Sequence, residues 1–494
     1  MQLRYIICAG FITCGPAMAQ DVYPGCEQPT PVSNHHTFFI DPSKGTDSGD
    51  GSITRPWKSL NTVLAPASKM IATKSHKTLT GSPLLDVNPA APIRSGDIIM
   101  LMSGDYGDVT LTNAFNDKFI TIMPAPGQKP TIQHLNIGGA ARWMFQGLTF
   151  QSEYPSGAKQ NAKIQVIVND GWGDKTNNIV FNSNVFQTEA DASAWSDADW
   201  YSKPNFYTVS IRSSCTAFTN SMFQNLLNGF SVAGSQTLIK NNTFRKFSND
   251  AIDVAAGNVT IVGNLMKEAM HNPTSALHPD AIQIWTTAVA GKIDVLNSNI
   301  LIDSNQVYMA KSPDGKRGIL QGITVGFCDN VTIQNNVVAT NLIDAIYANG
   351  LTNSKIVNNT VIASDPAGFT SRIVVTPSKY NASKNVVVQN NIANYIFALD
   401  TSVTMDHNIA LTNMTTFEAG KAVWHPTGIP ASQNLIQPTL TTNFRNWAPA
   451  QGGFDFHLKN ASALAETGSS LLAPSLDADG LTRATPFTLG AYAR

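Results

Sequence analysis

The chain has 494 residues and a formal net charge of −1 at pH 7, and 43% of its residues are hydrophobic whereas 14% are charged. This composition excludes a largely disordered chain, because such chains carry few apolar and many charged residues. The balance of charge gives no basic surface for nucleic acid or for an anionic membrane. The length allows one elongated domain with a large core.

Residues 1–19 have the order of regions found in an export signal. Arg4 supplies a positive charge, Tyr5 to Ile12 form a short apolar run, and Ala17 to Ala19 form a small-x-small cleavage site. The apolar run is too short to span a bilayer. We therefore expect cleavage after Ala19, a secreted or periplasmic protein, and no membrane insertion.

Cleavage would remove Cys8 and Cys14 and leave Cys26, Cys215 and Cys328. These three cysteines show no paired metal-ligand spacing such as C-x-x-C. Three is an odd number, so at most one disulfide forms within the chain. Cys215 and Cys328 lie near strand-like segments and are expected to be buried hydrophobic residues. Disulfides are therefore not expected to hold this fold together.

The N-terminal part of the mature chain predicts a strand, a turn and a helix. Residues 37–60 contain the apolar run Phe38 to Ile40, a Gly- and Asp-rich turn, and Pro56 to Leu60, which opens a helix. The terminal unit of a repeat protein must cover the open end of the core. We assign residues 20–75 to this strand and capping helix.

A short pattern then recurs, in which an apolar residue and two variable residues precede an asparagine. Two of its copies are 22 residues apart (264 − 242). A unit of that length cannot bury a face alone, whereas stacked units share a continuous core. Asparagine suits this role because it tolerates left-handed backbone and its side-chain amides can bond from unit to unit. The recurring asparagines are Asn184, Asn242, Asn264, Asn305, Asn336, Asn359 and Asn391.

This repeat predicts an all-β, single-domain right-handed parallel β-helix over residues 76–400, with C-terminal units and a closing segment over 401–494. The units also align on a second strand, whose flanking apolar residues should face inward because side chains alternate along a strand. Arg212 and Trp285, two positions further along that strand, should face outward. The outward column is predicted to contain Ser210, Ser231, Asp253, Gln283, Thr324 and Tyr347.

Both ends of the chain resemble those of secreted bacterial β-helix proteins related to alginate lyase and chondroitinase B. The resemblance rests on residues 37–60 and, at the other end, on Phe454 to Leu458, Asp477 to Arg483 and Leu489 to Tyr492. It implies the β-helix architecture and activity as a polysaccharide lyase.

One central unit has a faint similarity to polygalacturonase-type hydrolases. Residues 249–253 read Asn-Asp-Ala-Ile-Asp, close to the Asn-Thr-Asp-Gly-Ile-Asp run of those enzymes. The next unit carries His278, Pro279 and Asp280, where that family has paired aspartates. This similarity implies a glycoside hydrolase.

The chemistry-bearing residues gather on these two units. Asp250 and Asp280 occupy equivalent positions, three residues before Asp253 and Gln283, so stacking at about 4.8 Å brings the carboxylates and His278 into one patch. Such a cluster raises a pKa or recruits a cation. Asp250, Asp253 and Asp280 are candidate Ca²⁺ ligands. Asp253, Asp280 and His278 are candidate catalytic residues. Alternatively, the aspartates only end turns.

Inserted loops on one face should form a binding cleft around this patch. They cover residues 190–205, 267–277, 286–291 and 311–317, and the alternative is solvated decoration. The candidate cations or bases are Arg212, Lys246, Lys311 and Arg317. The candidate sugar-binding residues are Gln283, Trp285, Tyr347, Trp195 and Trp200, since aromatic faces pack on sugar rings.

Three functions compete for this pattern. A lyase that cleaves a uronate-containing polysaccharide by β-elimination is favoured, and it would use Ca²⁺ or arginine to neutralise the uronate. A glycoside hydrolase would need only the pair Asp253 and Asp280. A glycan-binding protein without catalysis is the third candidate. We expect a polysaccharide or oligosaccharide partner, no organic cofactor and a monomer.

Overall fold

The computed structural model describes residues 22–493 except for a set of short segments. The segments outside the description are 31, 66–67, 77–82, 153–163, 172–174, 271–277, 288–292, 294, 310–319, 365–369, 380–381, 401, 419–420, 426–434, 437–443, 449–452, 460–466 and 486. The predicted loop residues Lys311 and Arg317 therefore lie outside the described residues.

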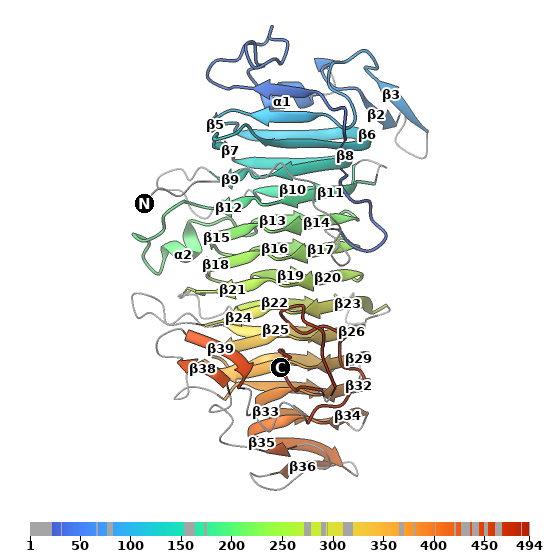
Figure 1. Ribbon diagram of the computed structural model, residues 1–494, viewed down its shortest axis with the longest axis vertical. Coiled ribbons are helices and arrows are strands. Elements are labelled where there is room, and N and C mark those ends of the chain that lie inside the picture. The colour runs from blue at the N-terminus through green and yellow to red at the C-terminus, as the bar shows by residue number, and fades with distance from the viewer. Residues whose placement is uncertain are drawn as a thin grey trace.

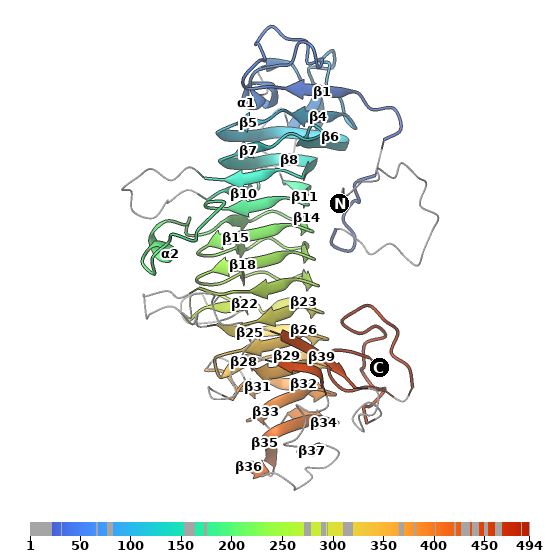
Figure 2. The same ribbon diagram turned by 60° about the vertical axis from the view of Figure 1, so that its left-hand side comes forward.

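The chain winds into a long parallel β-helix, in which each coil contributes three short strands (Figures 1 and 2). Strands of successive coils pair in parallel and form three walls around an apolar interior. The predicted all-β fold and the stacking of repeat units are thus confirmed.

The first wall carries the predicted outward column. It contains the N-terminal parts of β6 (Asp108–Pro124) and β8 (His134–Gln146), then β10 (Val166–Asn169), β13 (Val209–Ile211), β16 (Phe230–Val232), β19 (Ile252–Val254), β22 (Asp280–Trp285), β25 (Gln321–Gly326), β28 (Asp344–Asn349), β31 (Arg372–Thr376) and the C-terminal parts of β33 (Ile392–Ala398) and β35 (Ile409–Glu418).

The second wall follows the first after a corner. It contains β1 (Thr37–Ile40), β4 (Ile98–Leu101), the C-terminal parts of β6 and β8, β11 (Asn177–Asn182), β14 (Thr216–Thr219), β17 (Thr237–Lys240), β20 (Val259–Val262), β23 (Asn297–Asp303), β26 (Cys328–Gln334), β29 (Thr352–Val357), β32 (Lys384–Gln389) and β34 (Val403–Asp406).

The third wall closes the coil. It contains β5 (Gly104–Asp105), β7 (Pro130–Ile132), β9 (Thr149–Gln151), β12 (Val185–Gln187), β15 (Met222–Leu226), β18 (Thr243–Phe247), β21 (Leu265–Lys267), β24 (Gln306–Tyr308), β27 (Val337–Thr340), β30 (Thr360–Ala363), the N-terminal parts of β33 and β35, and β37 (Leu435–Ile436).

The predicted asparagine ladder runs through the corner between the second and third walls. The Nδ2 of Asn264 donates to Oδ1 of Asn305 at 2.9 Å, and Asn305 donates in the same way to Asn336 at 3.0 Å. These side chains are fully buried. The left-handed backbone belongs to the residue before each ladder asparagine, such as Ser304 with a φ of 55° and Asn335 with a φ of 56°. The amide ladder was therefore predicted correctly, but the left-handed position was not.

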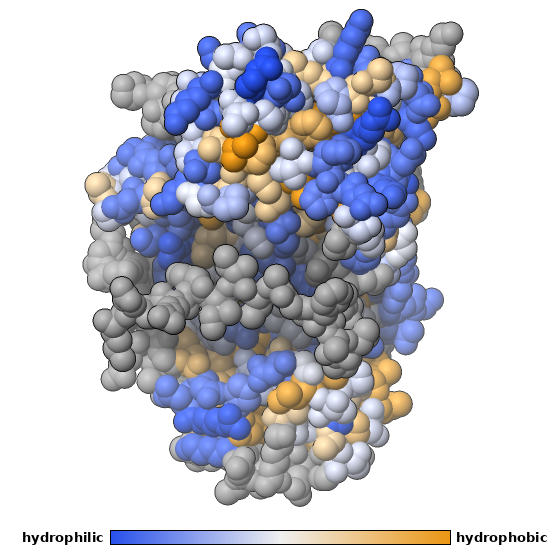
Figure 3. Space-filling view, turned by 45° about the horizontal axis from the view of Figure 1, so that its top comes forward, coloured by the Kyte–Doolittle hydropathy of each residue, from blue (hydrophilic) through white to orange (hydrophobic). Residues whose placement is uncertain are grey.

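A short α-helix covers the N-terminal end of the β-helix. Helix α1 (Leu60–Leu64) begins after Ser59, whose side chain accepts a hydrogen bond from the Thr62 amide, and its apolar residues join the core at the N-terminal end (Figure 1). An antiparallel hairpin, β2 (Thr73–His76) and β3 (Leu84–Val87), projects beside it. Figure 3 shows hydrophobic patches scattered among hydrophilic residues over this end.

Strand β36 (Lys421–His425) pairs antiparallel with the C-terminal part of β35, at the end of the first wall. A later segment folds back onto the outside of the third wall, and in it β38 (Phe444–Ala448) pairs antiparallel with β39 (Gly453–Leu458). Phe444 and Phe456 pack against outward residues of the third wall, among them Val337. The buried guanidinium of Arg483 fastens the final residues by donating to Oδ1 of Asn335 at 2.8 Å.

A disulfide corrects one expectation from the sequence. Cys26 is bonded to Cys215, so Cys215 is not the buried hydrophobic residue that was predicted. The bond ties the N-terminal segment to the second wall, where Val22 packs on outward apolar residues such as Leu238. Sequence patterning missed this pair because the two cysteines lie 189 residues apart. Cys328 is free and buried, as predicted.

Within the described part of the chain, no helix has the length and apolar character needed to cross a membrane.

Candidate functional site

The outward column of the first wall has the register predicted from the repeat. Ser210 pairs with Ser231, and Ser231 with Asp253. Asp253 pairs in turn with Gln283, and the column continues through Thr324 and Tyr347. Because apolar neighbours on both sides of each residue face the core, these side chains point away from the core along β13, β16, β19, β22, β25 and β28. Ser210 and Gln283 are nevertheless buried by their surroundings. The strands are stacked side by side in Figure 1.

Asp250 and Asp280 meet on adjacent coils, as predicted. The backbone N–H of Asp280 donates to Oδ1 of Asp250 at 2.8 Å, and Nδ2 of Asn249 donates to Oδ2 of Asp250 at 3.2 Å. The backbone N–H of Asp250 donates to Oδ1 of Asn228, one coil earlier, at 3.1 Å. The half-buried Asp250 carboxyl is therefore held by polar groups from two coils.

Asp280 is fully buried, although its carboxylate belongs to the outer wall. Its Oδ1 accepts a hydrogen bond from the hydroxyl of Thr324 at 2.6 Å, and its Oδ2 accepts one from Nε2 of Gln283 at 2.9 Å. Nδ1 of the exposed His278 lies 3.5 Å from the same Oδ2. Gln283, expected to bind sugar hydroxyls, is itself buried and engaged with Asp280.

Asp253 is half-buried and has a partner that the sequence did not suggest. The hydroxyl of Tyr207 donates to Oδ2 of Asp253 at 2.9 Å. Tyr207 lies three residues before Ser210, the same offset that separates Asp250 from Asp253. Aligning the repeat units would have placed this tyrosine at the position equivalent to Asp250. It would not have predicted that the tyrosine hydroxyl extends past the intervening coil to Asp253.

Burial and crowding shift the pKa values of the whole cluster, which we call the acidic cluster: Asp250, Asp253 and Asp280. Burial and, to a smaller extent, the neighbouring carboxyls raise the pKa of Asp250 to about 7, although the hydrogen bond from the Asp280 amide opposes the rise. Burial also raises the pKa of Asp253, although the Tyr207 hydrogen bond opposes that rise. The pKa of Asp280 is raised by burial as well. The hydrogen bond with Asp280 raises the pKa of His278 to about 9.

The hydrogen bonds limit what the acidic cluster offers to a metal ion. Both oxygens of Asp250 and both oxygens of Asp280 already accept hydrogen bonds from N–H or O–H donors. Over the described residues, no group of three or more His, Cys, Asp or Glu side chains is arranged to hold a metal. The residues therefore do not form a ready Ca²⁺ site, and calcium binding stays a prediction.

Several candidate residues lie apart from the acidic cluster. Trp195 and Trp200, the latter on α2 (Asp199–Ser202), are buried against each other and Met270 in a small core of the inserted loop. This burial argues against their predicted stacking on sugars. Arg212 is exposed just after β13, three coils before Trp285.

Tyr347 and Lys246 also lie apart from the acidic cluster. Tyr347 is half-buried on β28, three coils beyond Asp253, and Nδ2 of Asn349 donates to its hydroxyl at 3.4 Å. Lys246 belongs to the third wall and acts electrostatically on Asp191 in the inserted loop.

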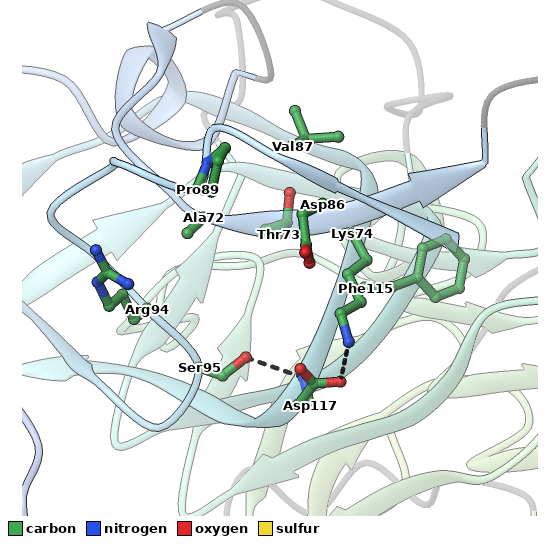
Figure 4. Close-up of a pocket in the computed structure, with 10 residues that line it drawn as sticks. All are labelled: Ala72, Thr73, Lys74, Asp86, Val87, Pro89, Arg94, Ser95, Phe115 and Asp117. Carbon is green, nitrogen blue, oxygen red and sulfur yellow. Dashed lines mark hydrogen bonds and ion pairs between the residues drawn. The ribbon is translucent and has the colours of Figure 1, made fainter. Parts of the chain in front are cut away.

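A separate hollow of about 230 Å³ lies at the N-terminal end, between the β2–β3 hairpin and β6 (Figure 4). Lys74 and Asp117 form a 2.7 Å ion pair at its edge, and the Ser95 hydroxyl accepts a hydrogen bond from the Asp117 amide at 2.9 Å. Arg94 and Asp86 also line it. This hollow is remote from β19 and β22 along the helix axis (Figure 1).

Comparison with known proteins agrees with the fold. Residues 207–372 match the family described as "Right handed beta helix region", which covers the acidic cluster. The observed coils and this match together define the fold as a right-handed parallel β-helix. No curated protein sequence matches it.

Solved structures with similar coils share little sequence with this chain. A pectate lyase is 13% identical with a TM-score of 0.46, covering 94% of this chain and 97% of its own. A rhamnogalacturonan lyase is 12% identical with a TM-score of 0.45, covering 86% and 97%. A lacto-N-biosidase from Eubacterium ramulus is 11% identical with a TM-score of 0.40, covering 76% and 67%.

Proposed function

We propose that this protein cleaves glycosidic bonds in a polysaccharide, with Asp250 and Asp253 as an acid–base pair on the first wall. The observation that carries the proposal is a pair of half-buried carboxyls on one coil, Asp250 held by hydrogen bonds from Asp280 and Asn249, and Asp253 held by one from Tyr207. Burial raises the pKa of Asp250 to about 7. Two carboxyl groups whose environments differ can divide acid and base roles in glycoside hydrolysis.

The environments suggest which group takes which role. With a pKa of about 7, Asp250 is partly protonated near neutral pH and would donate its proton to the leaving glycosidic oxygen. Asp253 accepts the Tyr207 hydrogen bond, which favours its ionised form, and would act as the base or nucleophile. Asp280 is buried, so we assign it a positioning role, in which it holds His278 and Gln283.

β-Elimination from a uronate polymer is the second candidate, and His278 favours it. Its side chain is 69% exposed, and its pKa of about 9 keeps it cationic at neutral pH. An imidazolium at the rim of the acidic cluster offers a partner for a uronate carboxylate, which elimination must neutralise. Asp250, with its pKa near 7, would then remove the proton next to that carboxylate.

Export of the chain, with a signal ending at Ala19, is part of the proposal. The disulfide between Cys26 and Cys215 supports it, because such bonds persist in oxidising compartments outside the cytosol.

A panel of acidic and neutral polysaccharides tests the proposal, with reducing ends and ultraviolet absorbance measured with and without a chelator. Hydrolysis releases reducing ends alone, whereas elimination also creates an absorbing double bond. Asp250→Asn and Asp253→Asn should each lower activity at least 100-fold.

Asp329→Asn is the matched control for that experiment. Asp329 is a half-buried aspartate on the second wall that accepts a hydrogen bond from Asn353 at 2.8 Å. This variant should retain wild-type activity. Full activity in both cluster variants would refute the acid–base assignment. Binding without cleavage of any polymer would identify a glycan-binding protein instead.

A further inference from the structure

Few aromatic side chains are exposed among the described residues. Among the described phenylalanine and tryptophan side chains, only Phe206 and Trp285 are exposed, by 46% and 39%. Large aromatic residues normally bury their surface, and here a stack that includes Phe181 and Phe218 fills the core. Phe206 lies just before β13 and Trp285 ends β22, and both strands belong to the first wall, where the acidic cluster lies.

Phe206 is fixed to the structure that holds Asp253. Its ring meets the ring of Tyr207 edge-on, with centroids 4.9 Å apart, and Tyr207 bonds Asp253. The carbonyl of Phe206 accepts a hydrogen bond from Nδ2 of Asn228 at 2.6 Å, which anchors the backbone to the next coil. The exposed ring therefore has a defined position on the N-terminal side of the acidic cluster.

Trp285 lies on the other side of the acidic cluster, at the end of β22. It follows Gln283 by two residues, so strand alternation points it outward as well. Its partner in the next coil is Gly326, and Ala255, directly after β19, precedes it in the column. Because neither neighbour has a large side chain, neither covers the indole.

The two rings bracket the carboxyls. Phe206 precedes the first-wall strand β13, Asp250 and Asp253 lie two coils further on, and Trp285 lies one coil beyond them. At about 4.8 Å per coil and about 3.3 Å per residue along a strand, the rings are on the order of 20 Å apart. That span accommodates several linked sugars, with the carboxyls between the rings.

We infer that Phe206 and Trp285 are stacking subsites on opposite sides of the acidic cluster. The protein would then bind an internal stretch of a glycan chain and cleave internal bonds, which is the endo mode. The inference rests on the proposed function and extends it by assigning the polymer a path across β13 to β22. The aromatic faces would pack on the apolar faces of sugar rings on both sides of the bond that is cleaved.

Affinity electrophoresis of the mature protein tests binding separately from catalysis. The gels contain polygalacturonate, alginate, xylan or a mixed-linkage β-glucan. Wild-type protein and Asp253→Asn should both be retarded by at least one polymer. Phe206→Ala and Trp285→Ala should each weaken that binding at least 5-fold, and Trp285→Phe should restore most of it. Leu481→Ala, which removes a 58% exposed side chain on the C-terminal segment, is the control and should bind as wild type.

The inference is overturned if none of the four polymers retards the protein, or if both alanine variants migrate as wild type. It is also overturned if wild-type digestion yields only mono- or disaccharides from the first time point, since an endo mode yields long fragments early. Loss of binding in the aromatic variants, together with full activity in Asp253→Asn, would leave the binding path standing and refute the proposed acid–base pair.

Discussion

The hydroxyl of Tyr207 reaches Oδ2 of Asp253 at 2.9 Å, although the two residues lie 46 positions apart and on coils that are not adjacent. The bond favours the ionised form of Asp253 and so opposes the effect of burial on its pKa. It also joins the catalytic candidate to the exposed Phe206 through the Tyr207 ring.

Tyr207→Phe should therefore change the acid limb of the pH–rate profile. Removing the hydroxyl raises the pKa of Asp253, so the rise of kcat/KM with pH should move to higher pH, by about 1 unit for a hydrogen bond to a charged group. At pH values below the pKa of Asp253, activity should fall on the order of 10-fold. A purely structural role for Tyr207 would lower activity equally at every pH.

Asp250→Asn should stabilise the protein at alkaline pH. The pKa of Asp250 rises from 3.8 to about 7 on folding. Its contribution to stability is therefore fully present below pH 3.8 and is lost as pH rises through 7. An asparagine has no such loss, so the variant should melt on the order of 2 °C higher than wild type at pH 8. The two proteins should melt together at pH 3.5, and equal melting at pH 8 would contradict the burial of Asp250.

Cys26→Ser should destabilise the protein by about 2–4 kcal/mol, because the disulfide restricts the unfolded chain. Cys215→Ser and the double variant should lose the same amount, since any one of these changes removes the whole bond. Thermal denaturation with and without a reductant measures the effect, and reductant should alter only the wild type. A larger loss in the double variant would show that the thiols have separate roles.

Asn305→Ala should cost about 2–4 kcal/mol, because it leaves buried donors without acceptors. Oδ1 of Asn305 accepts from both the backbone N–H and Nδ2 of Asn264, at 3.0 and 2.9 Å. Asn299→Gly is the control. It removes an exposed amide that bonds Asn258 and keeps the left-handed backbone that glycine tolerates. In denaturant unfolding, the control should keep nearly the wild-type free energy of unfolding. An equal loss of stability in both variants would refute the claim that the buried asparagines stabilise the protein more than exposed ones do.

The repeat pattern was sufficient to predict the parallel β-helix and much of the site. Strand alternation placed Asp253 and Gln283 in one outward column, and equal offsets placed Asp250 beside Asp280. Both placements are local consequences of side-chain alternation and of a unit that stacks in register, so they are readable from spacing alone.

The burial of individual site residues, and their hydrogen-bond partners on other coils, could be learned only from the tertiary structure. Asp280 and Gln283 share a buried hydrogen bond because Thr324, from the following coil, completes the group. From the sequence, Trp195 and Trp200 were predicted to stack on sugar rings. They pack on each other instead, because a long insertion needs a core of its own.

The sequence by itself determined the coil, the outward column and the pairing of Asp250 with Asp280, since these follow from a short periodicity. Only the tertiary structure decided that Tyr207 bonds Asp253, that Cys26 bonds Cys215 and that Phe206 is exposed. The physical reason is that insertions of unequal length separate the bonded residues in the sequence. Their proximity, and the exposure of Phe206, therefore depend on the path of the folded chain and cannot be predicted from a regular spacing.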